Sequence, residues 1–254
     1  MSNVILVGGL DVAELTFYLF FLFFLGLVWY LNRESRREGY PLENDLTGKV
    51  GDDIARLDFS DKKRFQLPHG MGIYVPEDVP RDAMPANVLP RLWSGEPLDV
   101  TGEPLGSGVG PGGYAMRADR PDVDMFGRPR IVPMAYDDHI NVVKGDIDPR
   151  GLPVIGLGGA VAGTVRDLWV DRAEHVLRYL DVALNNGGTA TLPMPMVRVS
   201  RKGVVTDSVT AAQFAGCPQL KSPTQITLLE EEKVSAYFGA GYLWATPERS
   251  EPLV

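Results

Sequence analysis

An uncharged apolar stretch near the N-terminus decides the fold: residues 15–31 read LTFYLFFLFFLGLVWYL. Counted from Val12, the segment has 20 residues, and its one charged residue, Glu14, lies close to the end. At 1.5 Å per residue, such a helix spans roughly 30 Å, the thickness of the hydrocarbon core of a bilayer. The sequence therefore predicts one transmembrane helix over residues 12–31, preceded by a short segment, residues 1–11.

A signal peptide and a buried helix of a soluble protein both fit this stretch less well. A signal peptide begins with a basic region and ends at a cleavage site of small residues. Here the first ten residues carry no charge, and residues 32–37 read NRESRR. A buried helix of a soluble protein is seldom so apolar on every side, which is more typical of a membrane span.

The basic residues that flank the helix predict its orientation. No Lys or Arg precedes Arg33, and three arginines follow the helix within a few residues. By the positive-inside rule, residues 1–11 are expected in the periplasm and the rest of the chain in the cytoplasm. Aromatic and basic side chains are typical of the membrane interfaces. The interface residues expected here are Tyr18, Trp29, Tyr30, Arg33, Arg36 and Arg37.

Composition excludes several classes of protein. Among 254 residues, 25 are basic and 33 are acidic, and a net charge of −8 argues against nucleic acid as the main partner. One cysteine, Cys217, rules out an internal disulfide and a metal site built from several cysteines. The apolar segment contains no His, Asn or Gln, and therefore offers no obvious ligand for a buried metal.

The chain from residue 32 to about residue 130 shows little periodicity. It is rich in proline, and residues 102–113 read TGEPLGSGVGPG. Such a long irregular stretch is unusual inside a compact domain. Scattered apolar residues such as Phe65 and Trp93 favour a connector that lies on a partner surface over a disordered segment.

From about Ile131 the pattern becomes that of short β-strands. Two β-rich runs, residues 164–170 and 176–184, flank a turn at residues 171–174, and NNGG at residues 185–188 marks a second turn. Strands at this spacing predict a mainly β domain, a small antiparallel barrel, over residues 131–254. A short C-terminal helix is expected to begin at Glu230, where acidic residues precede an apolar i, i+3, i+4 pattern.

Signals for an enzyme are weak. The sequence has no Walker loop, G-x-S-x-G, H-E-x-x-H or kinase motif. The run GLGG at residues 156–159 lacks the Rossmann spacing and predicts a hairpin turn, and three scattered histidines make no metal cluster. Composition and motifs therefore favour a membrane-anchored binding or structural protein rather than an enzyme.

Six runs, in the same order along nearly the whole chain, resemble the H subunit of the purple-bacterial photosynthetic reaction centre. They are RESRREGYPLE (33–43), FQLPHG (65–70), VGP (109–111), DPRGLP (148–153), DLWVDRAE (167–174) and LLEEEKVSAY (228–237). The resemblance implies an N-terminal helix beside the L and M subunits and a cytoplasmic PRC-barrel domain that caps them. It also implies that residues 32–130 lie across these partners.

The resemblance implies no cofactor held chiefly by this chain. The L and M subunits hold bacteriochlorophyll, bacteriopheophytin, the quinones and a non-haem iron. The antenna ring and membrane lipids are further expected partners. The expected location is the inner membrane or the intracytoplasmic chromatophore membrane. The implied function is to stabilise the L and M core and to help deliver protons to the secondary quinone.

The resemblance implies four candidates for proton delivery, and one further residue is expected to support them electrostatically. Glu174 matches the relay acid near the secondary quinone, with Asp171 in the same turn, and Arg178 is expected to set the field around Glu174. Asp124 and His69 match positions near the point of proton uptake. Without the resemblance, Asp171 and Glu174 would be interpreted as solvated turn acids and Asp124 as a surface acid. His69 would be a loop histidine, and Arg178 one half of a structural ion pair.

One departure from the family concerns proton uptake. Some members carry a His-x-His pair just after the acid that matches Asp124, whereas residues 125–128 here read MFGR. Uptake through paired histidines is therefore not expected in this chain.

Two rival functions stay open. One is a single-pass anchored enzyme, and the other is a PRC-barrel module in RNA processing, which the excess of acidic residues and the transmembrane helix disfavour.

Overall fold

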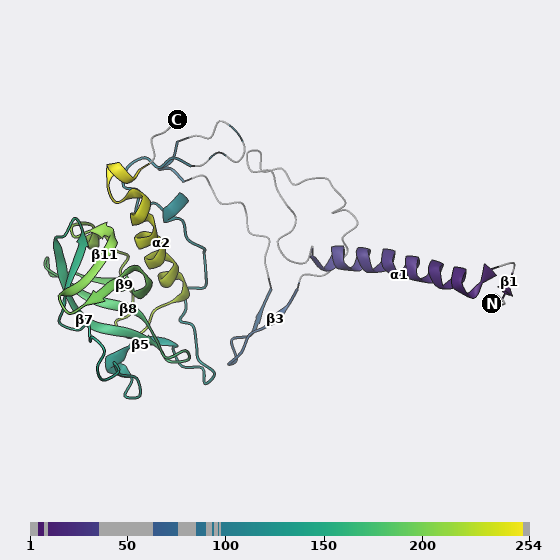
Figure 1. Ribbon diagram of the computed structural model, residues 1–254, viewed down its shortest axis with the longest axis horizontal. Coiled ribbons are helices and arrows are strands. Elements are labelled where there is room, and N and C mark those ends of the chain that lie inside the picture. The colour runs from purple at the N-terminus through teal and green to yellow at the C-terminus, as the bar shows by residue number, and fades with distance from the viewer. Residues whose placement is uncertain are drawn as a thin grey trace. The chain divides into compact units, whose positions relative to one another are not determined.

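The computed structural model describes residues 5–7, 10–35, 63–75, 85–89, 93, 96 and 98–250, and the chain divides into two compact units. One unit comprises Met1–Ala83 with Trp93–Gly95, and the other comprises Met84–Leu92 with Glu96–Val254. Figure 1 shows the elements of both units along the chain.

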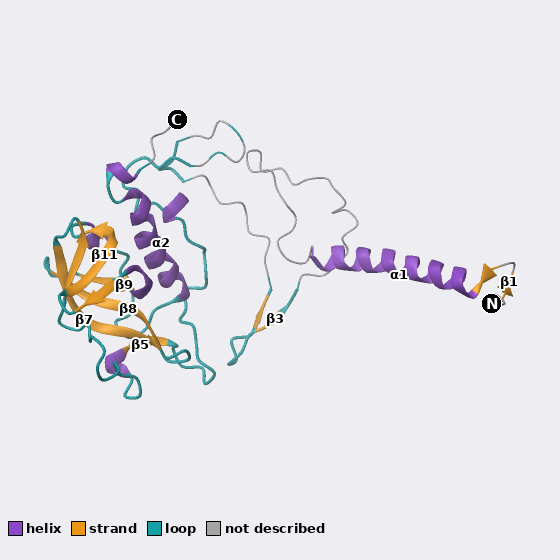
Figure 2. Cartoon of the chain, viewed as in Figure 1, coloured by secondary structure: helices purple, strands orange, loops and turns teal. Residues whose placement is uncertain are grey.

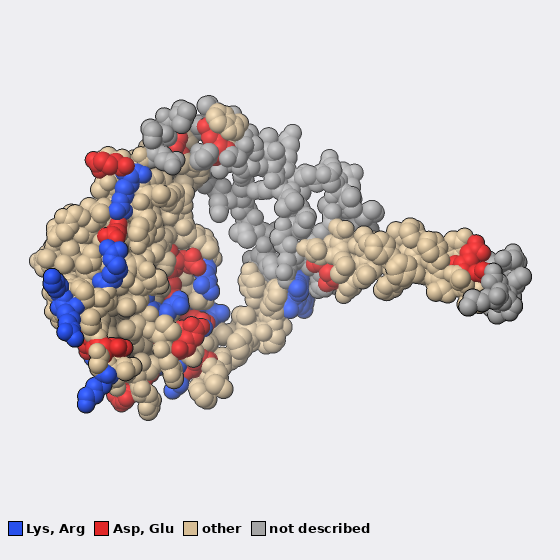
Figure 3. Space-filling model, in the orientation of Figure 1, with Lys and Arg blue, Asp and Glu red and all other residues tan. Residues whose placement is uncertain are grey.

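The first unit contains the apolar helix α1, Val12–Ser35. It covers the segment predicted to span the membrane and continues one turn beyond it. The Asp11 carboxylate accepts a hydrogen bond from the Glu14 N–H at 2.7 Å, which caps the start of the helix. Among the described residues, α1 is the one helix long and apolar enough to cross a membrane. Figure 3 shows charged side chains gathered at its two ends and none between them.

Short strand pairs complete the described part of this unit. β1 (Ile5–Val7) pairs with β2 (Leu10–Asp11), and β3 (Phe65–Gln66) pairs with β4 (Ile73–Tyr74), both antiparallel. Of the expected interface arginines, Arg33 lies with its guanidinium 5.6 Å from the centre of the Trp29 ring. Arg36 and Arg37 lie outside the described residues.

The second unit is built on a seven-stranded sheet with the path β10-β11-β6-β7-β8-β9, while β5 pairs with β7 (Figure 2). Neighbouring strands of this sheet are antiparallel except β6 and β11, which run parallel. The strands are β5 (Ile131–Pro133), β6 (Pro153–Leu157), β7 (Val161–Asp171), β8 (Val176–Leu184), β9 (Thr189–Pro193), β10 (Arg198–Ser200) and β11 (Gly203–Thr210). The predicted class, an N-terminal helix with a mainly β domain and a C-terminal helix, is confirmed.

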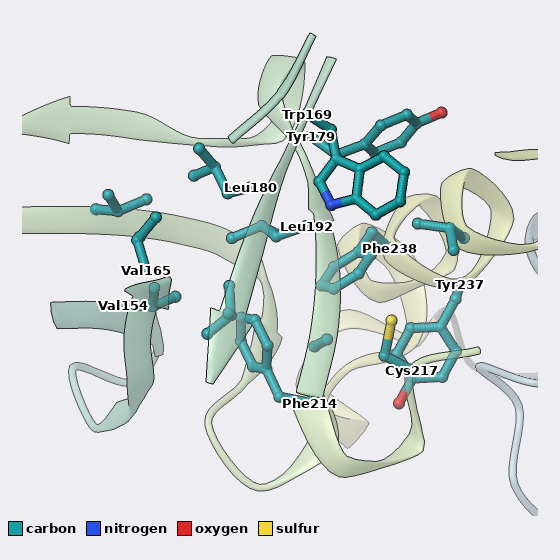
Figure 4. Packing of buried hydrophobic residues seen from close by; sticks show 14 of the residues in the cluster. Val154, Val165, Trp169, Tyr179, Leu180, Leu192, Phe214, Cys217, Tyr237 and Phe238 are labelled. Carbon is teal, nitrogen blue, oxygen red and sulfur yellow. The ribbon is translucent and has the colours of Figure 1, made fainter. Parts of the chain in front are cut away.

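The core forms between this sheet and the C-terminal helix α2, Leu228–Trp244. Leu180 and Leu192 of the sheet and Phe238 of the helix belong to one cluster of buried hydrophobic residues (Figure 4). The rings of Phe214 and Phe238 meet edge to face at 5.6 Å, and both side chains are fully buried. Full burial of one such side chain contributes roughly 1.5–3 kcal/mol to folding, so the α2 face is a main source of stability.

A capping box fixes the start of α2. The Thr227 hydroxyl accepts from the Glu230 N–H, and the Glu230 carboxylate accepts from the Thr227 N–H. These bonds satisfy two N–H groups that the first helical turn cannot pair. The helix therefore begins at Leu228, slightly before the predicted start at Glu230.

The compact unit also takes in part of the segment expected to be a connector. Leu105 and Val109 are buried, at 1% and 5% exposure. A side chain added at Gly110 would lie 3.1 Å from the ring of Trp244, so glycine allows this segment to approach α2 closely. Residues 96–130 belong with the barrel because apolar residues, spaced without any regular period, pack against it.

Replacement of Gly163 tests the packing of the β7–β8 hairpin. A Cβ at this position would overlap the backbone oxygen of Ala183. We expect Gly163→Ala to lower the free energy of unfolding by about 2–3 kcal/mol, because the two strands would have to separate. Urea unfolding of the full-length chain in mild detergent, followed by near-UV circular dichroism, measures this change.

Gly239→Ala is the matched control. Gly239 lies in α2 with open space where a Cβ would be. Alanine there should raise the free energy of unfolding by about 0.5–1 kcal/mol through its helix propensity. Equal effects of the two substitutions would contradict the close strand contact at Gly163.

Candidate functional site

The turn between β7 and β8 is built around Asp171, the last residue of β7. Its side chain is 1% exposed, and its Oδ1 atom accepts from the N–H groups of Ala173 at 2.9 Å and Glu174 at 3.0 Å. The Asp171 carbonyl also accepts from the His175 N–H at 2.8 Å. The predicted turn at residues 171–174 is thus closed by the aspartate that begins it, a common use of a short acidic side chain.

The register of β5 brings Arg130 to this turn. Ile131 pairs with Asp171, and the Arg172 N–H donates to the Arg130 carbonyl at 2.9 Å. The Nε of Arg130 then donates to both carboxylate oxygens of Asp171, at 3.0 and 2.8 Å. Arginine is suited to this role because its planar guanidinium offers several donors in fixed directions.

The same guanidinium contacts two further acids. The Nη2 of Arg130 donates to Glu174, and its Nη1 lies 3.5 Å from a carboxylate oxygen of Asp122. We call these four residues, Asp122, Arg130, Asp171 and Glu174, the Arg130 cluster. Three carboxylates around one guanidinium leave the cluster with two uncompensated negative charges.

The acids of the cluster differ in exposure and therefore in chemistry. Burial alone would raise the pKa of Asp171, but the Arg130 hydrogen bonds and the turn N–H groups hold it below the ordinary value. Asp171 is therefore an ionised, positioning acid at neutral pH. The side chain of Glu174 is 56% exposed, so its carboxylate reaches solvent while Arg130 holds it in place.

Asp124 organises a second turn, in the segment that leads to Arg130. Its Oδ1 accepts from the N–H groups of Phe126 at 2.8 Å and Arg128 at 2.9 Å, and its Oδ2 accepts from the Arg128 Nε at 2.8 Å. Burial opposes ionisation, but these bonds keep the pKa of Asp124 below its ordinary value. Asp124 is 7% exposed, so it is a buried turn acid rather than an open surface acid.

The tip of this second turn is apolar and exposed. Met125 is 81% exposed and Phe126 is 69% exposed. The guanidinium of Arg128 lies 5.1 Å from the centre of the Phe126 ring. A phenylalanine and a paired arginine therefore occupy the stretch where some family members carry two histidines.

The remaining candidates do not join the Arg130 cluster. His69 belongs to the first unit, between β3 and β4, with a left-handed φ of 53°. Arg178 lies 3.7 Å from Glu231, whereas the cation in contact with Glu174 is Arg130. The acid in contact with Arg178 is Glu231, which α2 presents to the start of β8, and the expected influence of Arg178 on the field around Glu174 stays a prediction.

The sequence alone does not place Arg130 at this site. The signal that points to it is the short apolar run of residues 131–133, which becomes β5 and places the preceding residue at the turn. Within the described ranges, no group of three or more His, Cys, Asp or Glu side chains is arranged to hold a metal ion. The arrangement can hold a carboxylate at the surface of the barrel within a network of fixed charges.

Two protein-family models match the chain. The model of the N-terminal region of the photosynthetic reaction-centre H-chain matches residues 4–136, and the model of the PRC-barrel domain matches residues 142–213. The chain belongs to the reaction-centre H-chain family. This family consists of structural subunits of the reaction centre, which agrees with the apolar helix α1 and the barrel of the second unit.

The Arg130 cluster joins the two regions of this H chain. Asp122 and Arg130 lie within the stretch matched to the H-chain N-terminal region, and Asp171 and Glu174 lie within the PRC-barrel match. Association with the reaction-centre core follows from membership of the family. The cluster is therefore the point at which the family-specific segment is attached to a barrel of a more general kind.

Substitution of Asp171 tests its positioning role. In Asp171→Asn, the turn keeps an oxygen acceptor but Arg130 loses a charged partner. We expect a loss of about 2 kcal/mol in the free energy of unfolding at pH 7, measured by urea unfolding in mild detergent. Asp207→Asn is the control, because Asp207 and Arg198 form an exposed pair worth under about 1 kcal/mol.

The effect of Asp171→Asn should depend on pH in a defined direction. The pKa of Asp171 is lower in the folded chain than the value of about 3.9 expected when unfolded. Its stabilisation is therefore complete above about pH 4 and is lost as pH falls through the folded-state pKa. A difference between wild type and variant that stays constant down to about pH 2 would contradict an ionised Asp171.

Proposed function

We propose that this H chain caps the L and M subunits on the cytoplasmic side and helps deliver protons to the secondary quinone. The observation that carries the proposal is the Arg130 cluster, in which a solvent-exposed Glu174 carboxylate is held beside the buried pair of Arg130 and Asp171. A proton-transferring group needs access to water and a fixed position, and Glu174 has both.

The capping role is supported by the two parts of the chain, an apolar helix and a folded barrel. One apolar helix confines the chain to the membrane, and a folded barrel with its own core provides a rigid cover. A cover over the quinone sites keeps bulk water away from the reacting groups. In this proposal L and M hold the bacteriochlorophyll, bacteriopheophytin, quinones and non-haem iron, and the antenna ring and lipids surround the complex.

The proton-delivery role assigns different tasks to different acids. The secondary quinone accepts two electrons and two protons in becoming a quinol, so protons have to pass the cap. Glu174 takes up and releases a proton, while Asp171 stays ionised and fixes Arg130 and the turn. Asp124 and His69 are proposed to act near the point of uptake, with Asp124 contributing its fixed negative charge.

Replacement of Glu174 tests the relay. Glu174→Gln keeps the shape of the side chain but cannot titrate. We expect normal charge separation and a normal first electron transfer to the secondary quinone, because neither step needs this acid. The second electron transfer and its proton uptake should slow by about tenfold, equivalent to roughly 1.4 kcal/mol of the barrier. Flash-induced quinone turnover with a pH-indicator dye measures both steps.

Two further measurements sharpen this test. Azide, a small diffusible acid, should partly restore the rate in Glu174→Gln by carrying protons past the missing carboxyl. Asp207→Asn, which removes an exposed acid of β11, should leave all steps unchanged. Unchanged second-flash kinetics in Glu174→Gln would reduce Glu174 to an ordinary turn residue.

The proposed location is the inner or intracytoplasmic membrane, with the N-terminus in the periplasm. Arg33 and the two arginines after it favour this orientation. We expect protease added to sealed chromatophores, which are inside-out, to digest the barrel unit, as detected with an antibody against it. Protection of the barrel there, with cleavage only near the N-terminus, would reverse the topology.

A further inference from the structure

A second acid of the barrel unit, Glu231 of α2, is enclosed between the helix and β8. Its Oε2 atom accepts a hydrogen bond from the Tyr179 hydroxyl at 2.8 Å, and it lies 3.7 Å from the Nη2 of Arg178. The Glu231 side chain is only 12% exposed. Glu231 is thus a largely buried carboxyl with one short neutral donor and one more distant cation.

Charged groups from two other elements act on this carboxyl group. Arg178 comes from β8, and Arg117 and Asp122 come from the segment that precedes β5. Arg117 is shared, because its guanidinium also lies 3.5 Å from Glu232. The nearby cations are therefore exposed or divided among several acids, and neither compensates fully for the burial of Glu231.

The balance of these influences is unfavourable to the ionised form. Burial is the largest and raises the pKa of Glu231; Tyr179, Arg178 and Arg117 lower it, and the charge of Asp122 raises it again. The net pKa lies above the ordinary value. Burial and the neighbouring carboxylate also raise the pKa of Tyr179 well above its usual range, so Tyr179 stays the donor and Glu231 is the member that titrates.

Asp122 links this acid to the Arg130 cluster. It lies 3.5 Å from Arg130, and its segment is attached to the start of α2, because Pro121 pairs with Thr227 and the Leu228 N–H donates to the Arg120 carbonyl at 3.0 Å. From this place its negative charge acts on Glu231 in the next turn of the helix. A proton bound by Glu231 removes one negative charge from the neighbourhood of Asp122. The coupling between the two acids is reciprocal: if protonation of Glu231 changes the free energy of the Asp122 charge, then removal of that charge changes the free energy of proton binding at Glu231 by the same amount.

We propose that Glu231 is a proton-accepting site of the barrel, coupled electrostatically to the Arg130 cluster through Asp122. A hydronium ion gives a proton to a carboxylate oxygen of Glu231: one O–H bond of hydronium breaks, one O–H bond of the carboxyl group forms, and a water molecule is left. The Tyr179 hydroxyl still donates to the carboxyl group. The site itself goes beyond the proposed function, and only its use as a proton reserve for Glu174 rests on that function. The plain structural alternative is a permanently ionised clamp between α2 and β8.

Carbon-13 NMR of the full-length chain in detergent micelles, labelled at the glutamate carboxyl carbon, tests the site directly. The Glu231 resonance is the one lost in Glu231→Gln. We expect it to titrate above the value of about 4.3 of an ordinary glutamate, whereas the resonance lost in Glu248→Gln should titrate below that value, because hydrogen bonds at its own helix start lower the pKa of Glu248. A Glu231 midpoint at or below the ordinary value would establish the ionised clamp.

The neighbours supply a pattern of opposite signs. Tyr179→Phe and Arg178→Gln should each raise the pKa of Glu231, because each removes a group that favours its ionised form. Asp122→Asn should lower it, because it removes a repelling charge. Asp122 is 40% exposed, so this substitution leaves the core intact, and an unmoved midpoint in Asp122→Asn would overturn the coupling.

These measurements need no quinone turnover. If the Glu231 midpoint is raised but quinone turnover is unchanged in Glu174→Gln, proton delivery through Glu174 is overturned and the Glu231 site remains. If the Glu231 midpoint is not raised but turnover slows in Glu174→Gln, the Glu231 site is overturned and the relay remains. The two proposals therefore fail separately.

Discussion

The antiparallel register of β5 on β7 is the constraint on which the site depends. Ile131 lies opposite Asp171, so the residue before the strand, Arg130, meets the turn that follows β7. A slip by one residue would turn every side chain of β5 to the other face of the sheet and carry Arg130 away from its acids. β7 also pairs with β6 and β8, so these strands fix its position in the sheet. The segment matched to the H-chain N-terminal region, which contains β5, is therefore attached to a strand that three neighbours hold in place.

The electrostatics of the cluster follow from one cation serving three anions. Asp171 lies deepest and accepts hydrogen bonds from the Arg130 Nε with both carboxylate oxygens. Hydrogen bonds to charged groups contribute roughly 1.5–3 kcal/mol, enough to offset its burial. Asp122 and Glu174 receive the remaining donors and stay partly in solvent. The same rule, applied to Glu231 with a neutral tyrosine as its nearest donor, gives the opposite result, because no cation lies close enough to offset burial. Asp171 is more deeply buried than Glu231, yet its pKa is lowered while that of Glu231 is raised, which follows from the charge of the nearest donor.

Local signals in the sequence are sufficient for the hairpins and the helices. The turns at residues 171–174 and 185–188, the apolar run of α1 and the acidic start of α2 all depend on neighbouring residues, and all can be predicted. The parallel pairing of β6 with β11 and the contact of Arg130 with Asp171 join residues far apart in the chain, and no local period encodes them. Leu105 and Val109 escape prediction for a related reason: they are buried one at a time within a Gly- and Pro-rich segment. The approach of Arg178 to Glu231 could not be predicted either, because it depends on where α2 packs, which the sequence of β8 does not contain.

The turn at Asp124 shows how a departure from a family pattern changes the physics of a surface. Its carboxylate accepts from two N–H groups and from Arg128, so its acceptor positions are filled within its own loop. A paired histidine at this surface would titrate near neutral pH and exchange protons with water, whereas Phe126 has no proton to exchange and Arg128 keeps its own at any physiological pH. In the proposed function, proton exchange depends instead on the exposed carboxyl group of Glu174, which Arg130 holds in the turn between β7 and β8.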